Sequence, residues 1–516
     1  MTVRIVTMGL LLATTACSMT PRHTMPAPPV ATHYPIALDG EAVPEWQGMF
    51  ADPRLQRLIT LALSESRDLR VAALNAEVAR AQIRVQRAQS LPGVTLDAGH
   101  TRQRQPSDVA GAGGGAMPGE AAGIDPGQVT AQAALTSFEI DLFGRLRAQN
   151  AAANQRYLAS REGQRAARLT VIGAVADAYL AERLADEQLR LAQATLADWQ
   201  TSLALVRHLH AAGQSSGIDL AEAEGLAREA QADQAQRTRE RLQATNALTL
   251  AVGGPIPADL PQPIALTAQP IKTALAADTP SELLTRRPDI MQAEHELRAA
   301  NADIGAARAA FFPRLSLTGA FGFASVALRT LFQSGSQSWS YSPAVSAPLF
   351  RGGELNATLD LSRLRSSIAV ATYERTIQTA FREVADGLAA RATFTTQLTA
   401  QMQAVAQAER RLTLARLSYQ AGVTGRLELL DAQRTVYAMQ QTLLTVRHAE
   451  LTSATALYRA LGGGPARIAI AGARVPGAKI EAVIRPADPI RPHLARDASG
   501  LTLQELPVHR AGRWRP

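Results

Sequence analysis

The residues whose types could carry chemistry are few, and their spacing does not assemble a catalytic site. The chain has one cysteine, Cys17, and its two closest histidines, His208 and His210, are separated by a single residue. Alternate residues do not share a helix face, and no acidic or thiol partner accompanies this pair, so no metal site is predicted there. The glycine-rich segment 111–119 precedes no helix cap, and neither HExxH nor GxxxxGK[ST] occurs in the chain. The sequence therefore indicates a protein that is not an enzyme.

The first 17 residues have the layout of an export signal. Arg4 supplies a positive charge, residues 5–12 are almost continuously apolar, and small residues precede Cys17. A lone cysteine at this place resembles the bacterial lipoprotein signal, in which the signal peptide 1–16 is removed and the cysteine is lipidated. We therefore expect a covalent lipid, such as palmitate, on Cys17 and no other cofactor. The alternative is an ordinary secretory signal cut near Ala16.

Composition favours long packed helices and argues against nucleic-acid binding. Hydrophobic residues make up 46% of the 516 residues, whereas aromatic residues make up only 4%, which is typical of aliphatic, alanine-rich helices. After the signal, no apolar run reaches the 18 or so residues that a spanning helix requires. The formal charge of +8 is concentrated in the Pro-rich segment 465–516, where nine Lys and Arg residues stand against four acidic ones. Because no basic stripe with interleaved aromatic residues precedes it, no nucleic-acid partner is expected.

Proline positions predict two long helical stretches. No proline occurs between Pro126 and Pro255, or between Pro348 and Pro465. A proline inside a helix costs about 3 kcal/mol, so long gaps are typical of helices. If 355–412 is one helix, its length is roughly 87 Å. Apolar residues recur there at the three- and four-residue spacing of a coiled coil: Tyr373, Ile377, Phe381, Val384, Leu388, Leu398, Met402, Val405 and Leu412.

The sequence is internally duplicated. The segment 211–254 has a counterpart without gaps at 420–463, 209 residues later. Upstream the repeat continues at a larger offset, so that Pro92 corresponds to Pro313. The difference is most easily assigned to the Gly- and Pro-rich segment 106–127, which we expect to be a longer loop in the first half. Two structurally similar halves are therefore predicted.

These observations give a division of the chain. The N-terminal lipidated segment covers 17–51, and the first repeat covers 52–255. A Pro-rich linker, 256–279, leads to the second repeat, 280–464. The basic tail 465–516 is expected to be disordered.

Four segments alternate between apolar and small polar residues, at about 93–102, 128–140, 313–324 and 337–349. Such strands of about ten residues are typical of transmembrane β-barrels. Two ordinary hairpins on a soluble core are the alternative, which their duplicate positions in an exported chain disfavour. In lipid only helices and closed barrels satisfy the backbone, and about eight strands are needed for the smallest filled barrel. Several chains must therefore combine, and three would give twelve strands.

Several motifs resemble one known family. Arg286, Arg287, Pro288 and Asp289 lie in a segment that closely resembles the hallmark of the TolC-like outer-membrane efflux factors, in their lipoprotein branch of the NodT/OprM type. The resemblance covers residues 17–464. Further matches are Asp141-Leu142-Phe143-Gly144-Arg145, Phe312-Pro313 and Tyr458-Arg459-Ala460-Leu461-Gly462-Gly463-Gly464.

The resemblance implies a fold, a location and partners. The fold class is mainly α with a membrane β part: a duplicated long-helix α-barrel protomer that contributes four strands to a trimeric twelve-strand outer-membrane barrel. The homotrimer is anchored by its lipid in the outer membrane, contacts outer-membrane lipid, and extends as helices into the periplasm. Its implied partners are a periplasmic adaptor protein and an inner-membrane RND transporter.

The function implied is passive efflux. The trimer is expected to be the outer-membrane duct of a tripartite pump that exports drugs or other small toxic compounds, which confers antibiotic resistance. The alternative within the same fold is a duct for type I protein secretion or for metal-ion efflux. A purely structural periplasmic coiled coil is a further alternative, which the alternating strands disfavour.

The resemblance also implies a gate at the periplasmic end. Leu427 would form an apolar ring, Asp431 an acidic ring, and Arg434 a charged partner that helps to hold the closed state. Tyr419 matches a tyrosine that links neighbouring helices. Leu427, Asp431 and Arg434 lie at i, i+4 and i+7, hence on one helix face. The alternative is an ordinary helix restart after Gly422, with Asp431 and Arg434 forming a surface pair.

Overall fold

The computed structural model describes residues 19–22, 24–36, 40–102, 127–276, 280 and 286–464. Cys17, the signal peptide, nearly all of the 106–127 loop and the tail 465–516 lie outside the described residues. The predictions made for those segments therefore stay predictions.

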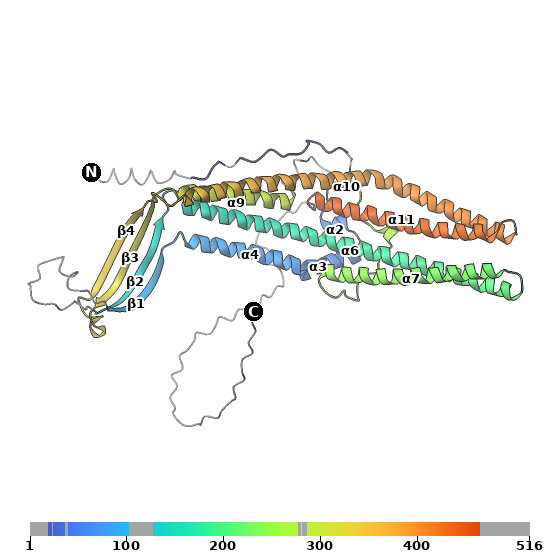
Figure 1. The fold of residues 1–516 in the computed structure, drawn as a ribbon, viewed down its shortest axis with the longest axis horizontal. Coiled ribbons are helices and arrows are strands. Elements are labelled where there is room, and N and C mark those ends of the chain that lie inside the picture. The colour runs from blue at the N-terminus through green and yellow to red at the C-terminus, as the bar shows by residue number, and fades with distance from the viewer. Residues whose placement is uncertain are drawn as a thin grey trace, which may run out of the picture. The chain divides into compact units, whose positions relative to one another are not determined.

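Four strands form one antiparallel sheet in the order β1-β2-β3-β4 (Figure 1). Their bounds are Gly93–Arg102 for β1, Gly127–Ile140 for β2, Arg314–Ser325 for β3 and Gln337–Ser346 for β4. β4 ends at Ser346, before the expected residue 349. β1 and β4 each have one edge that pairs with no other described strand.

The register separates two chemically different faces of the sheet. One row across the strands joins Leu96, Ala133, Phe321 and Trp339. The same face carries further apolar residues, among them Val94, Leu135, Tyr341 and Val345. The opposite face carries small residues, among them Thr95, Ala134, Ala320 and Ser340. The apolar face is open in the single chain, since Leu96 is 85% exposed and Trp339 68% exposed.

A β-bulge keeps this separation intact at the end of β2. Between Leu135 and Phe138 the register shifts, so that β2 uses one more residue than β3. Ser137, within the bulge, has a φ of 42°, in the left-handed region that non-glycine residues rarely adopt. An extra residue would flip every later side chain to the other face, but the bulge absorbs it, so Phe138 and Ile140 stay on the apolar face. The alternation in the sequence did not predict this bulge.

The helices form two related sets. Those of the first half are α2 (Trp46–Met49), α3 (Pro53–Glu65), α4 (Arg67–Ala88), α6 (Arg145–Ala211) and α7 (Gly217–Val252). Those of the second half are α9 (Pro288–Ala309), α10 (Glu354–Gln420) and α11 (Arg426–Ala460). Two short 3-10 helices are also present, η3 (Leu266–Ala268) and η4 (Leu328–Thr330). α6 packs on α7, α9 and α4, whereas α10 packs on α11 and α9 (Figure 1). Among the described residues, no helix is both long enough and apolar enough to cross a lipid bilayer.

The two halves repeat each other in detail. α6 and α10 are each 67 residues long. Each begins after a left-handed glycine, Gly144 with φ 78° and Gly353 with φ 87°. Their first residues, Arg145 and Glu354, are separated by the 209 residues found in the sequence repeat. The predicted duplication is therefore present in the structure.

The main core lies where α3, α6, α10 and α11 meet. Phe50, Tyr179 and Tyr458 are among its largest fully buried side chains. Tyr179 Oη donates to Asp52 Oδ2 at 2.6 Å, and the other carboxylate oxygen of Asp52 accepts from the Arg54 backbone N–H at the start of α3. The first part of the predicted seam of α10 faces this core, since Tyr373, Ile377, Val384 and Leu388 are buried there. The prediction is wrong for Met402 further along, which is 53% exposed.

Candidate functional site

The two helix-to-helix turns lie at the end of the helices away from the sheet (Figure 1). In the second half, Gly422 has a φ of 70° and allows the chain to reverse between α10 and α11. Tyr419 is half-buried in the last turn of α10, and Leu427, in the first turn of α11, is 75% exposed. Ile218, which the duplication pairs with Leu427, is 81% exposed at the other turn. Apolar side chains are therefore presented at both turns, and the duplication is the signal that would have found Ile218.

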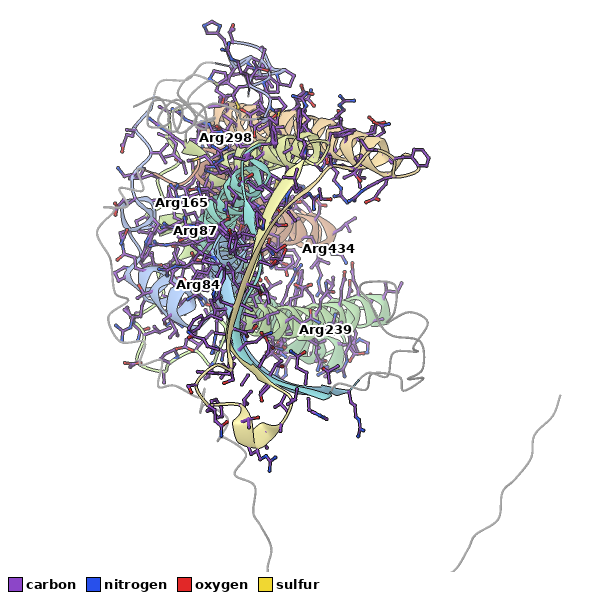
Figure 2. All side chains as sticks on the ribbon, turned by 90° about the vertical axis from the view of Figure 1, so that its left-hand side faces the viewer. Arg84, Arg87, Arg165, Arg239, Arg298 and Arg434 are labelled. Carbon is purple, nitrogen blue, oxygen red and sulfur yellow. The ribbon has the colours of Figure 1, made fainter. Side chains whose placement is uncertain are left out.

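The structure assigns the predicted charged residues to partners on other helices. Asp431 Oδ2 accepts from Arg411 Nη2 on α10 at 2.7 Å, and Arg434 Nη2 lies 3.6 Å from Glu229 Oε2 on α7. The alternative prediction, a surface ion pair between Asp431 and Arg434, is therefore wrong. Each of the two residues pairs with a side chain on another helix. All four side chains are largely exposed, so each pair is worth at most about 1 kcal/mol. Viewed along the helices, Arg434 lies on the side opposite to Arg84 (Figure 2).

Sequence reasoning missed Arg426, which joins the two turns. Its Nη1 donates to the backbone oxygen of Asp219 at 3.4 Å. Asp219 itself forms a capping box with Ser216 at the start of α7, and its hydrogen bonds to Ser216 lower the pKa of its carboxyl group. The counterpart of Arg426 in the first half is Gly217, so the contact exists once per chain. This difference between the two halves, an arginine in one and a glycine in the other, is the only sequence signal for the contact.

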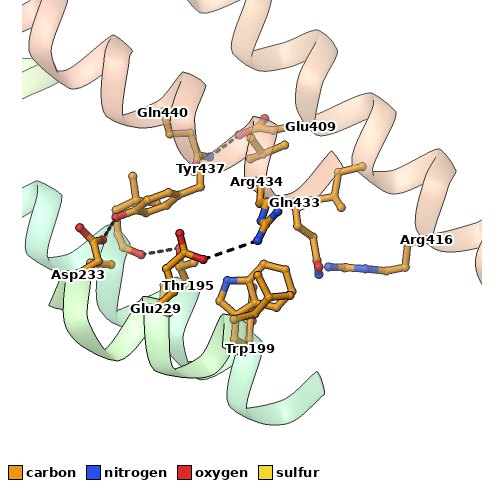
Figure 3. A pocket seen from close by; sticks show the side chains of 18 residues that line it. Thr195, Trp199, Glu229, Asp233, Glu409, Arg416, Gln433, Arg434, Tyr437 and Gln440 are labelled. Atoms are coloured by element: carbon orange, nitrogen blue, oxygen red, sulfur yellow. Dashed lines mark hydrogen bonds and ion pairs between the residues drawn. The ribbon is translucent and has the colours of Figure 1, made fainter. Parts of the chain in front are cut away.

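A pocket of about 630 Å³ lies between the helix pairs α6–α7 and α10–α11 (Figure 3). One hydrogen bond crosses between the pairs, in which Tyr437 Oη donates to the Asp233 carboxylate on α7. A second lies within the α10–α11 pair, where Gln440 Nε2 donates to Glu409 Oε1 at 2.8 Å. Burial, together with the Asp233 hydrogen bond, raises the pKa of Tyr437 to about 12. The tyrosine is therefore a neutral donor at physiological pH, and it ties α11 to α7.

The family motif is a structural junction. Pro288 and Asp289 occupy the first turn of α9, where proline and an acidic residue both suit a helix start. Arg287 is buried, with Nη1 donating to Glu383 Oε2 at 2.8 Å and to the Ala460 carbonyl at 2.9 Å. Its Nε and Nη2 both reach the Asp289 carboxylate. One guanidinium thereby joins α9, α10 and the end of α11, whereas Arg286 is exposed.

A second charged group lies beside this junction. Asp177 on α6 faces Arg459 Nη1 on α11 at 3.5 Å, and its Oδ1 has no hydrogen-bond partner among the residues that the structure describes. Burial raises the pKa of Asp177 to about 6, although the positive charge of Arg459 acts in the opposite direction. The Arg459 side chain crosses Gly173, where any Cβ would collide with it.

The histidines and the cysteine add no further site. His208 and His210 lie in the last turn of α6, and His210 Nδ1 is 3.0 Å from the Ser215 carbonyl. Across the described residues, no group of three or more His, Cys, Asp or Glu side chains is placed to hold a metal ion. Cys17 lies outside them.

Comparisons with known proteins agree on one family. The profile of the outer membrane efflux proteins matches residues 58–254 and 279–463. The toluene efflux pump outer membrane protein TtgI of Pseudomonas putida is 44% identical over 469 residues, which cover 89% of this chain and 97% of TtgI. Outer membrane protein OprJ of Pseudomonas aeruginosa is 42% identical, with 88% and 95% covered.

Solved structures show the same fold. The open state of the MtrE outer membrane channel of Neisseria gonorrhoeae has a TM-score of 0.78 at 38% identity, covering 87% of this chain and 98% of that one. CusC gives 0.77 at 37% identity, covering 87% and 100%. The predicted fold class, the outer-membrane location and the channel function without enzymatic activity are confirmed. The chain belongs to the outer membrane efflux protein family.

Proposed function

We propose that this chain forms, as a trimer, the outer-membrane duct of a tripartite pump that exports small toxic compounds. The observation that carries the proposal is an open four-stranded sheet with one apolar and one small polar face, continuous with two 67-residue helices. The apolar face suits lipid and the small polar face suits a water-filled lumen. The relatives named for toluene and solvent efflux support small apolar compounds as cargo.

The two free strand edges explain why several chains are needed. An unpaired edge in lipid leaves backbone groups unsatisfied at a cost of several kcal/mol each. Because the four strands alternate in direction, β4 of one copy can pair antiparallel with β1 of the next. Three copies close a ring of twelve strands, in the manner of a head-to-tail cyclic assembly.

The helices carry a matching pair of apolar surfaces. α4, which leads into β1, exposes a seam at heptad spacing: Val71, Leu74, Val78 and Val85. α10, which follows β4, exposes Leu361, Leu364 and Ile368 at the same kind of spacing. Each free edge of the chain is thus a strand continued by an apolar helix face. Pairing them buries residues that contribute roughly 1.5–3 kcal/mol each when fully covered.

Mass measurement in mild detergent tests this assembly. The wild-type protein should have the mass of three chains and dissociate on SDS gels only after heating. Leu74→Asp combined with Val78→Asp should yield monomers, whereas Asn75→Asp with Gln82→Glu adds the same charge at exposed polar positions of α4 and should leave the trimer intact. A monomeric wild-type protein would overturn the proposal.

Transport in cells tests the function. A strain lacking this chain should accumulate an apolar antibiotic or solvent, and regain efflux only when a periplasmic adaptor and an inner-membrane RND transporter are also present. If this chain instead restores secretion of a polypeptide when only an ABC exporter is present, the protein-secretion alternative would be favoured. The purified trimer should hydrolyse no nucleotide.

A lipid on Cys17 completes the proposed anchor. Mass spectrometry of the mature N-terminus should find an acylated cysteine. Cys17→Ser should remove the acyl groups and leave the trimer in the membrane, because the strands themselves hold it there. An unmodified mature chain that begins after Ala16 would instead establish an ordinary secretory signal.

The exposed turn of α10 and α11 supports a gate. Leu427 offers an exposed apolar side chain, and Asp431 and Arg434 lie one and two turns further along α11. A threefold axis would repeat each of them as a ring. Arg426 contacts the start of α7 at this end, and Tyr419, half-buried in the last turn of α10, is expected to link neighbouring helices.

A further inference from the structure

The pocket between the helix pairs α6–α7 and α10–α11 has the size and the lining of a ligand-binding site. The function as a duct does not require such a site. Its volume of about 630 Å³ lies within the range of small-molecule pockets. The lining includes the buried apolar side chains Trp199, Leu226 and Val436, contributed by three different helices. Trp199 and Leu226 also belong to a small buried cluster separate from the main core. An aromatic and aliphatic surface therefore faces an open space.

The charges around this pocket favour a cation. Four carboxylates line it, namely those of Asp198, Glu229, Asp233 and Glu409, against the two guanidiniums of Arg416 and Arg434. Arg237, outside the lining, neutralises Asp233 at 3.3 Å, and Arg434 stands beside Glu229. The carboxylates remain in excess after these pairs are set aside. The face of the Trp199 indole attracts a cation in addition, because the ring quadrupole places negative charge on its face.

We propose that this pocket binds an amphipathic aromatic cation. Its rings lie against Trp199, and its charge faces the carboxylates of Glu229 and Glu409. The site reaches all four long helices of the chain. A bound cation therefore holds the α6–α7 pair against the α10–α11 pair at the position of the pocket. This effect does not depend on the transport of cargo through the duct.

Arg434 already occupies the position beside Glu229 that the bound cation would take. Its guanidinium is 3.6 Å from Glu229, and both side chains are mostly exposed (Figure 3). Such a pair contributes little and is readily exchanged. A bound cation takes the place of Arg434 beside Glu229, so removal of Arg434 should tighten binding rather than weaken it.

Two ions of equal size and opposite charge test the site. Tetraphenylphosphonium and tetraphenylborate are titrated by calorimetry into the purified full-length protein in detergent. We expect one phosphonium ion per chain and borate binding at least about tenfold weaker after subtraction of the micelle background. Equal binding of the two ions, or no saturable phosphonium binding, would overturn the proposal.

Variants locate the site within the chain. Trp199→Leu and Glu409→Gln should each weaken phosphonium binding by about fivefold or more, and Arg434→Ala should strengthen it by about threefold. Glu224→Gln and Arg207→Ala remove a comparable exposed pair on α6 and α7 outside the lining, and should change nothing. Leu427→Ala, which alters the gate alone, should also leave binding unchanged. Weaker binding in Arg434→Ala would place the phosphonium elsewhere.

Discussion

Arg411 on α10 donates from Nη2 to Asp431 Oδ2 on α11 at 2.7 Å, so each carboxylate of the proposed acidic ring has a guanidinium partner within its own chain. Three bare carboxylates around an axis would repel one another, and this pairing reduces that repulsion. The acidic ring is therefore partly neutralised before any cation arrives.

This pairing predicts opposite effects of two substitutions on block by multivalent cations. Arg411→Ala exposes the full charge of Asp431 and should strengthen block from the periplasmic side by about threefold to tenfold. Asp431→Ala should weaken the block. Single-channel recording in planar bilayers measures both. Equal block in the two variants would show that Asp431 does not face the conduction path.

The exposed gate residues predict an easier opening. Arg434 and Glu229 form a loose pair worth at most about 1 kcal/mol per chain, so three copies supply at most about 3 kcal/mol to the closed state. Leu427→Ala combined with Arg434→Ala should raise single-channel conductance and sensitise cells to large antibiotics such as vancomycin. Arg207→Ala removes an exposed ion pair between α6 and α7 and should leave conductance and sensitivity unchanged. A double variant that conducts like wild type would make Leu427 and Arg434 packing residues.

The architecture could be read from the sequence because its signals are local or periodic. Proline gaps outlined α6 and α10, alternation outlined the strands, and the repeat supplied the correspondence between halves. The partners of Asp431 and Arg434 could not be read, because they lie on α10 and α7 and depend on how the helices pack. The role of Arg287 was likewise hidden, since its partners Glu383 and Ala460 are far away in the chain.

The Arg287 junction predicts a large loss of stability on substitution. Arg287→Ala leaves the Ala460 carbonyl and two carboxylates without their donor, at a cost of about 2–4 kcal/mol per chain. Arg287→Lys should recover little, since a single ammonium cannot serve three helices at once. Thermal unfolding of the purified trimer measures both. Arg382→Ala, at an exposed position of α10 beside Glu383, is the control and should cost less than about 1 kcal/mol.

Asp177 predicts a dependence of stability on pH. Burial raises its pKa from 3.8 to about 6, so the folded chain holds this proton more tightly than the unfolded chain between those values. Stability should therefore fall as pH rises from about 4 to 6 and stay lower above that range.

Asp177→Asn should remove this fall. Because the Asp177 side chain is still 39% exposed, water screens the cost, and the gain at pH 7 should be about 1 kcal/mol. Melting temperatures at pH 4 and pH 7 measure it. Asp386→Asn, at the exposed duplicate position in the second half, controls for the loss of one negative charge. A pH profile of Asp177→Asn parallel to wild type would assign the effect to other groups.

Inserting one more residue after Ser137 should turn the end of β2 inside out. The bulge absorbs one extra residue, so that Phe138 and Ile140 stay on the apolar face and Glu139 stays on the polar face, where it pairs with Arg145 at 2.6 Å. A second extra residue would turn both apolar side chains to the lumen and the Glu139 carboxylate to lipid, at a cost of several kcal/mol. We expect the insertion to abolish the heat-modifiable trimer in outer-membrane fractions. Deleting Ser137 removes the bulge but leaves Phe138 and Ile140 on the apolar face, because side chains alternate along a regular strand, so this variant should assemble like wild type. Assembly of the insertion variant would mean that the strand can re-register, and that the bulge is not what orients its end.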